Sequence, residues 1–95
     1  MDLYAIRRRS AWADSKALEA AAAKSTKVGN EDMPHKVRWI RSYVVKEDDG
    51  KLGTICIYEA KDAESLREHA RRVGMPGEEI DSIATTVVVR DDPKS

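Results

Sequence analysis

The sequence has a single cysteine, no long apolar run and no excess of charge of either sign. Cys56 cannot form an intrachain disulfide and has no second cysteine for a CxxC knuckle, which excludes a zinc finger and favours a reducing compartment. No apolar stretch approaches the length that crosses a bilayer. In the first ten residues, MDLYAIRRRS, the charges follow the apolar residues, unlike a signal peptide. We therefore expect a cytoplasmic protein that does not act at a membrane.

Opposite charges balance in this chain, with 17 Lys and Arg against 17 Asp and Glu and a formal net charge of zero. Because no long-range field attracts a polyanion, nucleic acid is not an expected partner. The 95 residues suffice for one domain with a modest core. We expect that domain to span residues 1–90 and a polar tail to occupy residues 91–95.

The clearest element is a helix that Asp62 caps at its start and that Gly74, followed by Pro76, brings to an end. Its inward stripe follows the helical period and comprises Leu66, His69, Ala70 and Val73. One of the two histidines therefore faces the rest of the protein. Such a residue is either a core histidine whose ring nitrogens are satisfied by neighbours, or a ligand or proton-transfer group.

The N-terminal part of the chain predicts a strand and a helix. Residues 3–9 alternate with apolar groups on both faces, which predicts an interior strand, and its run from Arg7 to Arg9 is interpreted as a solvated strand edge. Residues 15–28 carry a narrow stripe of mostly small residues, which predicts a helix close to a sheet. Gly29 and Asn30 are expected to end this helix in left-handed geometry.

Three further strands are expected in the second half of the sequence. Residues 37–45 form the strongest strand pattern, with Trp39 and Tyr43 on one face. An Asp-Gly turn then predicts a hairpin to the strand over residues 52–60, and a last strand is expected over residues 82–90.

This order of elements predicts an α+β fold, a ferredoxin-like βαββαβ sandwich with a four-stranded antiparallel sheet whose first and last strands lie in the middle. Two helices cover only one face of such a sheet. We expect a second copy to cover the other face, giving a homodimer in the form of a dimeric α+β barrel. A C-terminal segment lying over that face is the alternative, but the tail DDPKS is short and polar.

Three blocks of the sequence point to a family: WIRSYV at residues 39–44, ICIYEA at residues 55–60 and REHARRVGMP at residues 67–76. Together they resemble a family of small nickel-responsive proteins, otherwise a domain of unknown function. The resemblance implies a dimeric ferredoxin-like fold that can bind nickel and has no established catalytic activity.

Nickel favours imidazole and also accepts carboxylate and thiolate. No pair of histidines has ligand spacing, so a dedicated intrachain site finds little support in the pattern. Carboxylates at Glu31 and Asp32 lie near one histidine. The candidate metal ligands are His69, His35, Glu59 and Cys56.

An alternative function is that of a dimeric α+β-barrel enzyme of the monooxygenase, isomerase or lyase type. Trp39, Tyr43 and Tyr58 could line a pocket for a small organic ligand. Proton transfer by His69, assisted by Tyr58 or Glu59, is the chemistry that such a site would offer. The competing interpretation is that the aromatic residues pack in the core and at the dimer interface.

Overall fold

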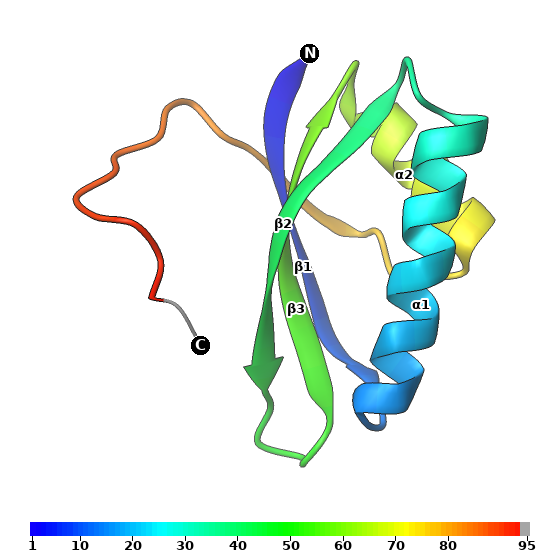
Figure 1. Cartoon of the computed structure of the whole chain (residues 1–95), viewed down its shortest axis with the longest axis vertical. Coiled ribbons are helices and arrows are strands. Elements are labelled where there is room, and N and C mark those ends of the chain that lie inside the picture. Colours follow the sequence, from blue (N-terminus) through cyan, green and yellow to red (C-terminus); the bar gives the residue numbers. More distant parts are fainter. Residues whose placement is uncertain (94–95) are drawn as a thin grey trace.

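Four antiparallel strands and two helices make up the fold of this protein, as a computed structural model that describes residues 1–93 shows. Both helices lie on one side of the sheet (Figure 1). This ferredoxin-like arrangement confirms the predicted fold class. The elements are β1 (Asp2–Trp12), α1 (Ser15–Lys27), a π-helical turn (Val28–Asp32), β2 (Val37–Lys46), β3 (Leu52–Ala60), α2 (Ala63–Val73) and β4 (Glu79–Ser82).

The strand order in the sheet is β2-β3-β1-β4, so β1 and β3 are the central strands. The prediction that the last strand lies in the middle is therefore wrong. β3 pairs along its length with both β1 and β2, whereas β4 pairs with β1 alone over four residues. Burial agrees with this order, because Thr54, Cys56 and Tyr58 on β3 are all buried, whereas the residues of β4 are exposed or half-buried.

The last strand is shorter and earlier than the predicted span of residues 82–90. Pairing ends at Ser82, and the segment over residues 83–92 leaves the sheet and arcs out on the side away from the helices (Figure 1). Val87, Val88 and Val89 are 84%, 70% and 81% exposed. A β-branched run favours a strand only where a neighbouring strand can pair with it, and within residues 1–93 none does.

The first helix does not end in left-handed geometry at Gly29 and Asn30 as predicted, since neither has a positive φ. The chain instead continues through a π-helical turn, in which the amide of Met33 bonds the carbonyl of Val28 at 3.0 Å. Val28 and Met33 are both buried in the core. The wider turn therefore brings Met33 inward before the chain enters β2.

Trp39 and Tyr43 do not share a face of the sheet, contrary to the prediction. Trp39 is opposite Tyr58, whereas Tyr43 is opposite Ile55, because a bulge inserts one residue between Trp39 and Arg41. One extra residue reverses the alternation of all later side chains. Trp39 consequently lies on the helix side and Tyr43 on the open side.

The second helix agrees with its prediction at both ends and on its inward face. Asp62 accepts hydrogen bonds from the amide and hydroxyl of Ser65, at 2.8 and 2.7 Å. Gly74 closes the helix in left-handed geometry, with φ of 83°. The four residues of the predicted stripe are all buried.

No helix within residues 1–93 is both long enough and apolar enough to cross a membrane. The predicted tail begins at Asp91, and its last two residues, 94 and 95, lie outside the described part of the chain. The division into a domain and a tail stays a prediction.

Candidate functional site

Four polar side chains are buried together between the sheet and the helices. Arg8 comes from β1, Ser25 from α1, Tyr58 from β3 and His69 from α2, and each is at most 3% exposed. We call these four residues the buried polar cluster. Because the two central strands and both helices each contribute one residue, the cluster lies where the sheet meets the helices.

His69 is held by the first helix. Its Nε2 lies 3.1 Å from the main-chain carbonyl oxygen of Ser25. A carbonyl oxygen can only accept, so Nε2 carries the proton and, in the neutral ring, Nδ1 is a bare acceptor. That Nδ1 is buried and has no hydrogen-bond partner within residues 1–93. Burial, with a smaller contribution from the Arg8 charge, lowers the pKa of His69 and keeps the ring neutral.

Tyr58 connects the other members of the cluster. Its hydroxyl lies 3.2 Å from that of Ser25, its ring meets the His69 ring edge-on at 5.6 Å, and Trp39 stacks on it at 6.3 Å. Burial raises the pKa of the Tyr58 hydroxyl. The neutral phenol therefore serves as a hydrogen-bonding group here rather than as a base.

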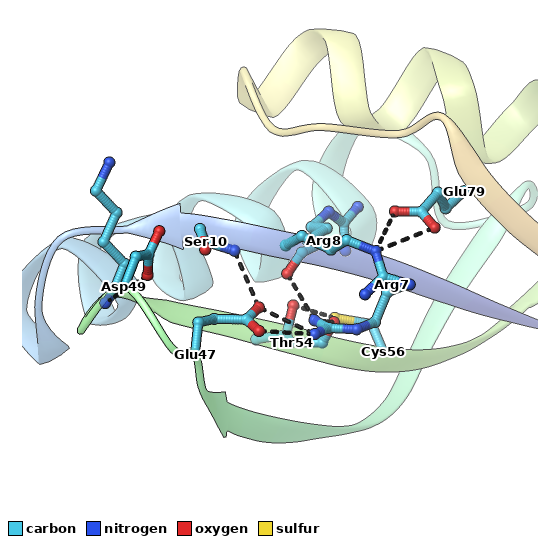
Figure 2. Close-up of polar contacts among 10 residues, drawn as sticks. Arg7, Arg8, Ser10, Glu47, Asp49, Thr54, Cys56 and Glu79 are labelled. Carbon is cyan, nitrogen blue, oxygen red and sulfur yellow. Dashed lines mark hydrogen bonds and ion pairs between the residues drawn. The ribbon is translucent and has the colours of Figure 1, made fainter.

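Two residues of this site, Arg8 and Ser25, were not predicted as site residues from the sequence. The basic run was interpreted as a solvated edge, which is wrong for Arg8, because β1 is a central strand and Arg8 is 1% exposed. Arg7 turns toward Glu47, with Nη2 3.0 Å from its carboxylate, while Arg8 turns away from it (Figure 2). The signal was present: alternation places Arg8 on the buried face with Tyr4 and Ile6.

Two hollows flank the Tyr58 ring on the helix side. One, of about 310 Å³, is lined by Arg8, Trp12, Leu18, Cys56 and Met75 among others. The other, of about 330 Å³, is lined by His69, Gly29, Asn30 and Val37 among others. Ser25, Trp39 and Tyr58 line both hollows.

The four predicted metal ligands are not brought together. His69 and Cys56 are buried on the helix side, His35 is exposed in the turn before β2, and Glu59 points to the open face and pairs with Arg38 at 3.3 Å. Among residues 1–93 no three His, Cys, Asp or Glu side chains are grouped so that they could hold a metal ion. The residues of one chain therefore do not fit a nickel site.

The residues predicted for an organic ligand are partly brought together. Trp39, Tyr58 and His69 line one hollow. Tyr43 lies on the other face of the sheet, as does Glu59, so neither reaches His69 within one chain. The catalytic role suggested for His69 with Tyr58 stays a prediction.

The chain was compared with known families, curated proteins and solved structures. No curated protein matches the chain. The crystal structure of SCO4226 from Streptomyces coelicolor A3(2) matches with a TM-score of 0.71 at 17% identity, over 90% of this chain and 99% of the other. A likeness at this identity establishes the fold. The model of the family described as nickel responsive protein SCO4226-like matches residues 4–83. The chain therefore belongs to the SCO4226-like family of nickel-responsive proteins.

Proposed function

We propose that this protein is a cytoplasmic homodimer that binds nickel through ligands from two chains. The observation that carries the proposal is the family match over residues 4–83, whose description is nickel responsive. Since one chain lacks a grouped set of donors within residues 1–93, a second chain is the simplest source of the missing ligands.

The open face of the sheet supports the dimer. Ile55 and Tyr43 are exposed on it, and a hollow of about 770 Å³ separates it from the segment over residues 83–92. Asp92 anchors the far end of that segment, accepting hydrogen bonds from Tyr43 at 2.7 Å and Arg41 at 3.1 Å. The C-terminal segment thus lies over part of this face, as the alternative to the dimer expected, but it leaves a hollow beneath it. A second copy would take the place of the Asp92 contacts, cover Ile55 and Tyr43, and give the exposed valines of the segment a partner.

The accessible donors lie at one end of the sheet. His35 precedes Val37, which is opposite Ala60, and Glu59 comes just before Ala60 on the open side. His35 and Glu59 from each of two chains would provide two imidazoles and two carboxylates, a donor set that suits nickel. Nickel could reach His69 and Cys56 only if the core opened, because both side chains are buried.

Nickel calorimetry on tag-free protein tests the proposal. The wild-type protein and His69→Gln should bind nickel alike, whereas His35→Ala should weaken binding at least tenfold. Absence of heat with the wild-type protein would remove the proposal. Loss of binding in His69→Gln with retention in His35→Ala would move the site to the buried cluster.

A second candidate function, an enzyme with a small organic substrate, is favoured by the hollow of about 330 Å³ that His69, Trp39 and Tyr58 line. A neutral imidazole with a free ring nitrogen can accept a proton from a substrate. A thermal-shift screen against metals and metabolites separates the two functions, since only the enzyme predicts stabilisation by metabolites that His69→Asn abolishes.

A further inference from the structure

Among the described residues, 1–93, no carboxylate pairs with the buried charge of Arg8. Its Nε donates to the carbonyl oxygen of Pro76 at 2.7 Å, and its guanidinium carbon lies 5.9 Å from the centre of the Tyr58 ring. Nη1 and Nη2 are buried and have no hydrogen-bond partner within residues 1–93. The exposed Glu19 lines the same hollow, but it forms no ion pair with Arg8. A guanidinium that is buried without an anion lowers the stability of the fold, because it has lost its hydration without gaining an ion pair.

Most of the surface of the hollow beside Arg8 is apolar, although Glu19 and several hydroxyl side chains also line it. Its walls include Trp12, Leu18, Trp39, Val44 and Met75. A cavity of about 150 Å³ with such walls can hold benzene. The hollow here, of about 310 Å³, has room for a ring and a short substituent.

We propose that this hollow binds a small organic carboxylate with an apolar body. The carboxylate would accept two parallel hydrogen bonds from Nη1 and Nη2 of Arg8, a pairing whose geometry a planar guanidinium matches. The apolar body lies between the two tryptophans. Met75, half-buried and unbranched, is the lining side chain that can shift to admit the ligand. Because most of the hollow's surface is apolar, the organic body supplies part of the binding, which an inorganic anion lacks.

The site is independent of the proposed nickel binding. The hollow lies on the helix side of the sheet, whereas Glu59 and the open face lie on the other. Loss of one activity therefore leaves the other measurable.

Benzoate and phenylacetate, each compared with its own primary amide, are suitable probes. The protein contains two tryptophans, and both line this hollow, so tryptophan fluorescence reports binding directly. At least one carboxylate should change the fluorescence and raise the melting temperature, with an affinity at least tenfold above that of its amide. Inorganic phosphate should produce neither effect. Equal responses to acid and amide, an equal response to phosphate, or no response to any probe would overturn the proposal.

Two variants of Arg8 and one matched control assign the binding. Arg8→Met removes the charge and Arg8→Lys keeps it without the paired donors, and both should lose at least tenfold in carboxylate affinity. Arg9→Met makes the same change at an exposed neighbour that pairs with Glu79, and should bind as the wild-type protein does. If Arg8→Met does not fold, the carboxylate affinity of Arg8→Lys tests the proposal alone. Wild-type affinity in a folded Arg8 variant, or an equal loss in Arg9→Met, would contradict the proposal.

Discussion

The Nε2 of His69 donates to the main-chain carbonyl oxygen of Ser25 at 3.1 Å, which ties the second helix to the first across the core. This carbonyl lies near the end of α1, and the chain continues from there into the π-helical turn. The bond therefore gives the histidine on the inward stripe of α2 a structural role, and it leaves the buried Nδ1 without a hydrogen-bond partner within residues 1–93.

Acid should destabilise the protein through His69. Its pKa is lowered by burial, so below about pH 6.5 the unfolded chain takes up a proton at this residue that the folded chain does not. The free energy of unfolding should then fall with falling pH until the lowered pKa of the folded state is reached. Urea titrations between about pH 7 and 5 measure this pH dependence of the free energy of unfolding. His69→Gln should reduce this slope, and the matched variant at the exposed histidine, His35→Gln, should not.

The bulge in β2 predicts different outcomes at two aromatic positions. Tyr43→Asp places a charge on the open face and should dissociate the dimer while the monomer stays folded. Trp39→Asp places a charge on the helix side, where the 37% exposed Trp39 stacks on Tyr58, and should lower the free energy of unfolding without dissociating the dimer. Light scattering and circular dichroism distinguish the results. A folded dimer in both variants would show that the open face is not the interface.

The cap of α2 should contribute measurably to stability. Asp62→Ala removes the acceptor of two hydrogen bonds from Ser65 and should lower the free energy of unfolding by about 1 kcal/mol. Asp14, the cap of α1, accepts one bond, from the amide of Ala17. Asp14→Ala should therefore cost less in the same denaturant titration, and an equal or larger cost would contradict this ranking.

The fold was predictable where signals are local. The cap at Asp62, the left-handed Gly74 and the apolar period between them each depend on residues within one helix, and all three agree with the structure. The strand order depends on which strands pair, a long-range property, and it was predicted wrongly. The bulge after Trp39 leaves no mark in a regular alternation, so Trp39 and Tyr43 were wrongly predicted to share a face.

The candidate site was predictable only in part, for the same reason. Periodicity placed His69 inside the fold, but nothing local indicates that its partner is a carbonyl in the other helix. Arg8 was hidden within a basic run, where composition suggested solvent although alternation placed it in the core. The strand pattern of residues 85–89 was present, yet within the described chain it has no strand to pair with.

The central claim, nickel held by two chains, is tested most directly by measuring nickel binding and mass together on Tyr43→Asp. Tyr43 belongs to the open face, where it donates to Asp92, and it is not a proposed ligand, so its replacement removes no donor atom from the proposed nickel site. Calorimetry with light scattering should show wild-type dimers that bind one nickel ion per two chains, and folded Tyr43→Asp monomers that bind none. A monomeric variant that binds nickel with wild-type affinity would contradict the claim.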